Sequence, residues 1–451
     1  MAIRIALISA NRHCEPYPVY PLGTAYLKSY LMKEIDDAQV DVVDMNLTSD
    51  DELSSYLKRE RPHYIGLSIR NVDGANSLDR RGFLPSYKHI ASVVRQASSS
   101  PLIIGGAAFS IFPELFMREI GADYGIKGEG EAALCELIKS LQEGREVSHI
   151  GDLYNSEGRC LAPRTQYLVT PQACYEPHLV EYYWKMSGML NIQTKRGCPY
   201  NCIYCTYPQI DGRSVRNVAI ESVVDTMARA KREYGVNYWF FTDSVFNISP
   251  SYNAALAEAI IAEGLDISWG AYFTPSNITD EELSLYKRAG LTHIEFGTES
   301  FCDQTLEAYG KRFTFDKVLE ASEIALKNNI YYSHFLILAG WGESRTTLAQ
   351  SIENSKLLRH TVIFPYVGMR IYPSTLLQSC CVESGVLSRE DNLLEPRYYI
   401  SPDFDLEECR AMAESSGKAW IFPDAEPSEM MTMLKVKRNK KGPLWEYLRR
   451  P

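Results

Sequence analysis

Short apolar runs alternate with segments of helical periodicity along the first 150 residues. Each run has the length of a buried strand, and the segments between them repeat apolar residues every three or four positions. This alternation predicts a Rossmann-like parallel sheet in an α/β domain, with helices on its faces. The expected strands are 3–9, 40–45, 64–69, 102–104 and 124–126, and the expected helices are 22–32, 52–59, 87–94, 113–120 and 131–141.

A second alternating series occupies the middle of the chain, after a stretch rich in Tyr and Pro that begins with a predicted hairpin. Its expected strands are 191–194, 238–242, 267–271, 293–297, 334–338 and 366–371. Six strand–helix units predict a partial (β/α)6 barrel of TIM type, whose site lies at the carboxyl ends of the strands. The predicted domains are a Rossmann-like domain (1–150), a connector (151–190), the barrel (191–375) and a small, mainly helical C-terminal region (376–451).

Composition narrows the class of protein. The 451 residues carry a net charge of −10, which disfavours electrostatic binding of nucleic acid. The sequence contains neither an apolar run long enough for a membrane span nor a cleavable apolar leader, so we expect a cytoplasmic protein. In a reducing compartment the 11 cysteines indicate metal binding or catalysis before disulfides.

Three of these cysteines cluster in the segment TKRGCPYNCIYCTYP. Cys198, Cys202 and Cys205 have the spacing C-x3-C-x2-C. Three cysteines packed on one helical face are one interpretation, although Gly197 and Pro199 disfavour a continuous helix there. A zinc site is a second, although no second cysteine pair follows at the usual spacing. A third is an iron–sulfur cluster with three thiolate ligands and one open iron.

With Tyr204 before its last cysteine, the motif resembles the C-x3-C-x-(aromatic)-C signature of the radical SAM superfamily. The resemblance implies a [4Fe-4S] cluster whose open iron binds S-adenosylmethionine (SAM), with Tyr204 near the adenine. Three later segments resemble strand ends of the same barrel, namely FFTDSVFN, GTES and RIYPST. Through them the resemblance assigns Asp243, Glu299, Ser300 and Arg370 to SAM binding. Taken singly, each segment is equally typical of an ordinary strand-to-helix turn.

An α/β domain ahead of such a barrel resembles the cobalamin-dependent class of the superfamily. The resemblance rests on the turn at Gly105 and Gly106 and on the turn at Gly128 and Glu129. Glycine permits close approach of the backbone to a bulky ligand, so these residues are the predicted cobalamin contacts. The alternative is that they are helix-opening turns of an ordinary doubly wound domain.

The first domain lacks the D-x-H-x-x-G motif through which mutase-type proteins supply a histidine to cobalt. Arg70 and Asn71, after the third strand, are therefore predicted to face the lower side of the cobalt. A protonated arginine has no lone pair for a metal and would leave that side without a strong ligand. The loop 70–86 that begins here is long, and it is predicted either to cap the corrin or to reach the barrel.

The resemblance implies a methyltransferase that moves a methyl group from SAM, via methylcobalamin, to an unactivated carbon or to phosphorus of a small molecule. A cyclase or rearrangement enzyme that keeps cobalamin is an alternative, as is a corrinoid carrier without turnover. A reductase such as flavodoxin or ferredoxin is the expected partner. The basic segment 435–450 is a candidate docking site for it, although a solvated tail is the commoner explanation of such a run.

Overall fold

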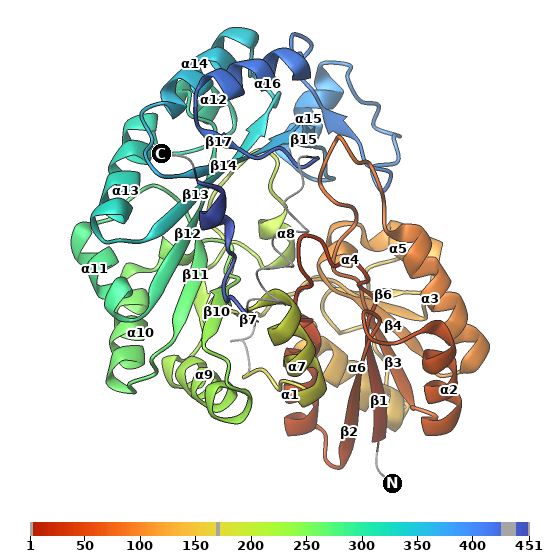
Figure 1. Ribbon diagram of the computed structural model, residues 1–451. Coiled ribbons are helices and arrows are strands. Elements are labelled where there is room, and N and C mark those ends of the chain that lie inside the picture. Colours follow the sequence, from red (N-terminus) through yellow and green to blue (C-terminus); the bar gives the residue numbers. More distant parts are fainter. Residues whose placement is uncertain (1–2, 168–171, 425–438, 450–451) are drawn as a thin grey trace.

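The protein contains two sheets that lie side by side, each with helices along its outer side (Figure 1). This computed structural model describes residues 3–167, 172–424 and 439–449. Within these residues, no helix combines the length and the apolar character that crossing a membrane requires. The first sheet comes from the N-terminal part of the chain and the second from the middle.

The first sheet has the strand order β2-β1-β3-β4-β5-β6. Strands β1 to β5 are parallel, as predicted, and β6 runs antiparallel to β5. Because β6 comes from the predicted connector, this sheet extends past residue 150. The strands are β1 (Ile3–Ser9), β2 (Ala38–Asp44), β3 (Tyr64–Ser68), β4 (Leu102–Gly105), β5 (Tyr124–Ile126) and β6 (Leu153–Asn155).

The helices of this domain follow the predicted periodicity, and their ends carry recognisable signals. In α2, Ser49 and Glu52 form a capping box, which satisfies backbone N–H groups at the first turn. Acidic residues in that turn and basic residues in the last one match the helix dipole. The helices are α1 (Leu22–Glu34), α2 (Asp50–Glu60), α3 (Leu84–Ala97), α4 (Ala107–Ile111), α5 (Pro113–Ile120) and α6 (Glu131–Glu143).

The second sheet has the order β17-β14-β13-β12-β11-β10-β7, and all its neighbouring strands are parallel. Its two edges do not pair with each other, so it forms the predicted partial barrel. The strands are β7 (Leu190–Ile192), β10 (Tyr238–Phe241), β11 (Ser268–Phe273), β12 (Leu291–Glu299), β13 (Tyr331–Leu338), β14 (Val362–Val367) and β17 (Ala419–Trp420). The helices after them are α9 (Ile220–Tyr234), α10 (Pro250–Ala262), α11 (Asp280–Arg288), α12 (Asp303–Ala308), α13 (Phe315–Lys327) and α14 (Arg345–Ser355), with η1 (Phe246–Ile248) before α10.

Shorter elements connect and close these two units. α7 (Pro177–Ser187) precedes the barrel, and a small hairpin of β8 (Lys195–Arg196) and β9 (Arg216–Asn217) encloses α8 (Tyr207–Ile210). The regular elements of the C-terminal region are mainly helices, as predicted, namely α15 (Leu376–Glu383), α16 (Leu406–Ser415) and η3 (Trp445–Leu448). It also supplies the edge strand β17 and the strand β16 (Tyr398–Tyr399), which pairs with β15 (Met369–Arg370).

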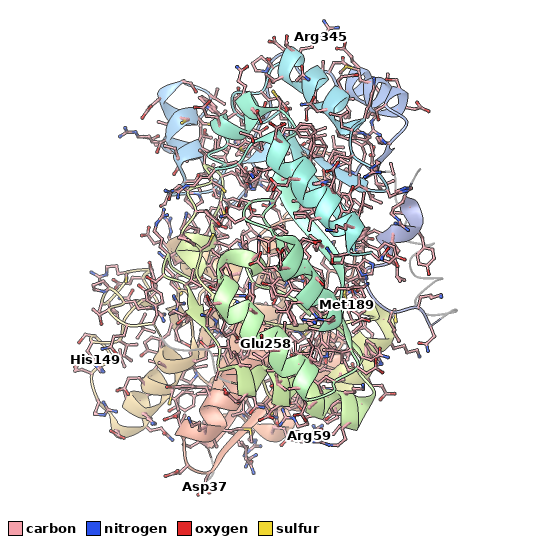
Figure 2. All side chains as sticks on the ribbon, turned by 90° about the vertical axis from the view of Figure 1, so that its left-hand side faces the viewer. Asp37, Arg59, His149, Met189, Glu258 and Arg345 are labelled. Carbon is pink, nitrogen blue, oxygen red and sulfur yellow. The ribbon has the colours of Figure 1, made fainter. Side chains whose placement is uncertain are left out.

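The loop 70–86 joins the first domain to the barrel. Its Asp73 accepts a hydrogen bond from Arg370, and its Ser77 donates one to the carbonyl of Val367, at the end of β14. Of the two predicted roles of this loop, the structure therefore shows the contact with the barrel. Seen from the barrel side, Arg345 at the start of α14 and Asp37 before β2 lie at opposite ends of the molecule (Figure 2).

Candidate functional site

The three cysteines of the C-x3-C-x2-C motif lie in one loop between β8 and α8. All three line a cavity of about 290 Å³ above the carboxyl ends of the barrel strands, which we call the cluster cavity. At Gly197 the backbone has a φ of +92°, and a Cβ would lie 2.1 Å from the carbonyl oxygen of Ser214, so only glycine fits. The backbone N–H of Cys198 donates to the carbonyl of Gly212 at 3.0 Å. The loop is therefore held in place by the segment that returns after α8.

The thiols of the motif are close enough to influence one another. Burial raises the pKa of Cys205 to about 12, and the neighbouring Cys202 and Cys198 contribute to the rise, whereas Lys311 opposes it. In the described part of the chain, no three His, Cys, Asp or Glu side chains are grouped as ligands of a single metal ion would be. The three cysteine ligands of a [4Fe-4S] cluster each bind a different iron. Three thiols facing one cavity fit that group.

Tyr204 and Glu299, both predicted to bind SAM, meet in the cluster cavity. The Tyr204 hydroxyl donates to Oε1 of Glu299 at 2.7 Å. A shift of the β12–β13 register between Gly297 and Glu299, with a φ of +70° at Glu299, marks a bulge that breaks the regular alternation of β12 before this carboxylate. Lys311 donates to the same carboxylate oxygen at 3.3 Å and to the carbonyl of Gly297 at 3.1 Å. The cavity wall thus carries a carboxylate and a lysine side by side.

Asp243 and Ser300, also predicted to bind SAM, lie outside the lining of this cavity. Asp243 is fully buried and accepts hydrogen bonds from the backbone N–H of Thr194 at 2.7 Å and from Nζ of Lys195 at 2.8 Å. Its carboxylate therefore fixes the strand that leads into the cysteine loop. Ser300 is buried, and its hydroxyl accepts from the N–H of Cys302 at 3.2 Å. Neither residue lines the cluster cavity, and their roles in SAM binding stay predictions.

Arg370, also predicted to bind SAM, makes a buried ion pair with the first domain. Its Nε donates to Oδ2 of Asp73 at 2.8 Å, and a terminal nitrogen donates to the carbonyl of Leu393 at 2.8 Å. Both partners of the ion pair are buried, and Arg370 does not belong to the lining of the cluster cavity. Its position in the motif RIYPST suggested SAM binding, but a buried guanidinium needs a compensating charge, and the first domain supplies it. The structure therefore shows Arg370 in a contact between the domains, and its role in SAM binding stays a prediction.

A second cavity, of about 340 Å³, lies between the first domain and the barrel, and we call it the interdomain cavity. Its lining includes all four predicted turn residues, Gly105, Gly106, Gly128 and Glu129. Gly106 has a φ of +99°, and a Cβ there would lie 2.5 Å from the carbonyl oxygen of Ile69. The walls are mostly apolar, with Leu7, Leu22, Leu27, Leu67, Ile103, Ile104, Ile126 and Leu134 among them. An apolar ligand, or an apolar part of a larger one, fits this space.

A third cavity, of about 350 Å³, adjoins the interdomain cavity and is called the connecting cavity here. The two share Ser68 and Gly106 in their linings. Arg70, which was predicted to face the lower side of the cobalt, lines the connecting cavity. Asn71 belongs to the lining of none of the three cavities, and its carbonyl accepts a hydrogen bond from the Tyr87 hydroxyl at 2.7 Å.

Two tyrosines join the three cavities. Tyr207 lines all of them, and Tyr272 lines both the cluster cavity and the connecting cavity. Sequence analysis did not identify either residue, nor Lys311. Tyr207 follows Cys205 by two positions, a signal that could have been used. Tyr272 and Lys311 carry no motif, and only the folded barrel brings them to the cavity.

Comparison with known proteins agrees with this arrangement. A sequence model of the B12 binding domain matches residues 8–138, and a model of the radical SAM superfamily matches residues 192–354. The chain is a cobalamin-dependent radical SAM enzyme. This enzyme is similar to the uncharacterized methyltransferase PH0819 of Pyrococcus horikoshii, with 27% identity over 78% of this chain and 77% of the relative. It is also similar to the tryptophan 2-C-methyltransferase of Streptomyces laurentii, with 25% identity over 82% and 73%.

Among solved structures, the enzyme shares its fold with the radical SAM methyltransferase TsrM of Kitasatospora setae. The TM-score is 0.87 at 20% identity, covering 99% of this chain and 97% of TsrM, whose structure holds cobalamin and a [4Fe-4S] cluster. The predicted fold class, the enzyme class and the three cofactors are confirmed. The prediction of a methyltransferase of this class is confirmed by the same relatives. The roles of individual residues stay predictions.

Proposed function

We propose that this enzyme transfers a methyl group from SAM, by way of cobalamin, to a carbon atom of an aromatic small molecule. One observation carries the proposal: the cluster, connecting and interdomain cavities meet at Tyr207. SAM, corrin and substrate can therefore reach one another without leaving the protein. When bound, SAM supplies the methyl group and an adenosyl radical, the cluster supplies the electron, and cobalamin carries the methyl group.

In this proposal Cys198, Cys202 and Cys205 hold the cluster, and the wall beside it positions SAM. The carboxylate of Glu299 suits the amino group or the ribose of SAM, and the ammonium of Lys311 suits its carboxylate. Tyr204, whose hydroxyl is held by Glu299, presents its ring to the adenine. Each group is oriented by a hydrogen bond within the protein, so little ordering is needed when SAM binds.

Arg70 is proposed to cover the lower face of the cobalt from the connecting cavity. A guanidinium would exclude water from this face without ligating the metal. The variant Arg70→His places a possible ligand at the same position. We expect nitrogen hyperfine splitting in the electron paramagnetic resonance spectrum of the cob(II)alamin form of this variant, and none in the original protein.

The methyl acceptor is proposed to bind where the connecting cavity meets the cluster cavity, on the side of the cobalt opposite to Arg70. Phe240 and Tyr272 pack edge to face there, with ring centroids 4.9 Å apart, and Tyr207 borders the same space. Flat aromatic rings bind well between such side chains. Tryptophan, which is bound in a second structure of TsrM, is the first candidate to test.

A reductase of the flavodoxin or ferredoxin type is proposed to deliver the electrons. Lys435, Lys437, Arg438 and Arg450 of the predicted docking segment lie outside the described residues. Of the rest, Lys441 lies 4.1 Å from the ring centre of Trp184, and Arg449 lies 4.4 Å from that of Tyr331. Docking on this segment stays a prediction.

The deciding experiment is anaerobic turnover with a reconstituted cluster, hydroxocobalamin, SAM, a reductant and tryptophan. A methyltransferase that uses SAM in both ways produces S-adenosylhomocysteine and 5′-deoxyadenosine together with methylated tryptophan. Formation of S-adenosylhomocysteine without methylated tryptophan would show that tryptophan is not the substrate. The reaction class, methyl transfer from SAM, would be retained. Formation of 5′-deoxyadenosine alone would favour the cyclase or rearrangement alternative, and formation of neither product would favour a corrinoid carrier.

A further inference from the structure

Charged residues of both domains cluster at one wall of the interdomain cavity. Arg196 donates to Glu131 at 2.6 Å and lies 3.8 Å from Glu129, and Arg216 donates to Glu129 as well. Asp211, at the end of α8, belongs to the same group and is attracted by both arginines. Three carboxylates therefore share two guanidinium groups at this wall, which leaves an excess of negative charge.

Asp211 differs from the other two acids of the wall. Its side chain lines the interdomain cavity, although the residue is only 9% exposed. Its backbone carbonyl accepts a hydrogen bond from Arg216 at 2.9 Å, but within the described residues its carboxylate accepts none. Burial raises the pKa of Asp211 to about 6, as expected where water has been removed and not replaced by a donor. A buried carboxylate that borders a cavity without a hydrogen-bond donor is a binding group for a ligand that brings one.

We propose that Asp211 is a corrinoid-binding residue, contributed by the radical SAM domain, that accepts a hydrogen bond from an uncharged donor of the bound cofactor. The excess of carboxylates at this wall repels the phosphate of the cofactor, so a neutral group is the favourable partner. Cobalamin offers two kinds, the amide N–H groups around the corrin and the ribose hydroxyls of its nucleotide tail. The inference rests on the proposed cobalamin-dependent function and places part of the cofactor in the interdomain cavity.

The position of Asp211 also connects the two cofactors. The next residue, Gly212, accepts the N–H of Cys198, the first cysteine of the cluster motif, at 3.0 Å. A corrinoid that binds Asp211 would therefore contact the segment that supports the cysteine loop. The B12-binding domain ends at residue 138, before the cysteine motif begins. None of its residues is therefore next in sequence to a residue that supports the cysteine loop.

The test measures corrinoid affinity and does not depend on turnover. Cluster-loaded protein is titrated anaerobically with hydroxocobalamin and, separately, with dicyanocobinamide, which has the corrin amides but lacks the nucleotide tail. The variants are Asp211→Asn and the smaller Asp211→Ser, so that a folding defect of one does not remove the test. Asp225→Asn, an exposed position on α9, is the matched control. Iron content and far-ultraviolet circular dichroism verify that each variant is folded.

Both variants of Asp211 are expected to bind hydroxocobalamin about tenfold more weakly, the usual effect of losing a hydrogen bond to a charged group. If the Asp211 variants lose as much affinity for dicyanocobinamide as for hydroxocobalamin, the donor is a corrin amide. If their affinity for dicyanocobinamide is unchanged, the donor is a ribose hydroxyl. Affinities within about twofold of the original for both corrinoids, in folded variants, would overturn the role of Asp211. Failure of the original protein to bind either corrinoid would overturn the cobalamin-dependent function as well.

Discussion

The cluster cavity and the interdomain cavity are built in different ways. All residues that line the cluster cavity come from the barrel, and the cysteine loop supplies several of them within a short stretch of sequence. The interdomain cavity takes its lining from the strand ends of the first sheet and from the barrel segment around α8. The first cavity therefore depends on a local motif, whereas the second depends on how the two domains meet.

The charged residues of the two cavities are also paired in different ways, within one domain or across two. In the cluster cavity Glu299 is paired with Lys311 within the barrel. In the interdomain cavity the acids of the first domain, Glu129 and Glu131, are paired with barrel arginines. A charge pair formed across a domain boundary holds the domains in register, so loading of the second cavity should be more sensitive to changes far from its walls.

The largest expected effect separates the two cavities. Replacement of Cys198, Cys202 and Cys205 together with alanine removes every thiolate of the motif, so the iron–sulfur absorbance should disappear completely. Corrinoid affinity should stay within about threefold, because these side chains do not line the interdomain cavity. Both quantities are measured by anaerobic absorbance titration. Retained iron–sulfur absorbance would contradict the cluster assignment.

Arg370→Ala tests the boundary between the domains. It leaves Asp73 buried without its partner, which should lower the free energy of unfolding by about 3–5 kcal/mol. Chemical denaturation measures this change, and Arg345→Ala, which breaks an exposed pair with Glu408, is the control with a much smaller effect. SAM affinity measured on folded protein should be unchanged. A selective loss of SAM binding would instead support the predicted role of Arg370 in SAM binding.

His334 tests which face of β13 belongs to the site. Burial lowers its pKa to about 3, and it contacts Thr298 and Ser322 on the helix side, whereas its neighbour Phe335 lines the cluster cavity. The unfolded chain takes up a proton below about pH 6.5 and the folded chain does not, so stability falls as the pH drops from 7 to 5, by about 2 kcal/mol. His334→Gln should remove this dependence in denaturation curves measured at the two pH values. If the stability of both proteins depended equally on pH, His334 would not be the source of this dependence.

Lys311→Met tests the charge pair inside the cluster cavity. Loss of the ammonium leaves Glu299 without its cation, so the affinity for SAM should fall about tenfold. Equilibrium dialysis of cluster-loaded protein with SAM measures the effect. Lys317→Met, at an exposed position on α13, should change the affinity by less than twofold. An unaffected Lys311→Met variant would show that this pair does not position SAM.

The smallest effect is expected at Asn71. Its side chain does not border the described cavities, so Asn71→Ala should leave hydroxocobalamin affinity within about twofold. Arg70→Ala, at the neighbouring position on the connecting cavity, is the comparison. A larger loss for Asn71→Ala than for Arg70→Ala would show that the loop 70–86 rearranges when corrinoid binds.

Much of the fold was predictable because each strand is a compact apolar run and each helix repeats every three to four residues. The order of strands β7 to β14 in the barrel follows, since parallel strands joined by helices usually lie next to one another. In the first sheet the order does not follow from the sequence, because β3 pairs with β1 and not with β2. Strand β17 was not predictable, because it contributes only Ala419 and Trp420 to the edge of the barrel. Strand β6 was expected as part of a hairpin but not as a member of the first sheet, because its partner β5 lies in another predicted domain.

The candidate site divides along the same line. Sequence alone determined the three cysteines, Tyr204 and the glycine turns, because spacing and residue type within a short segment specify their chemistry. Tertiary structure decided the rest: it moved Arg370 to Asp73, buried Asp243 beneath the cysteine loop, and brought Lys311, Tyr207 and Asp211 to the cavities. These outcomes depend on which side chains face each other across strands and domains. A charge buried in such a place takes the nearest opposite charge or donor, and that partner is visible only in the folded chain.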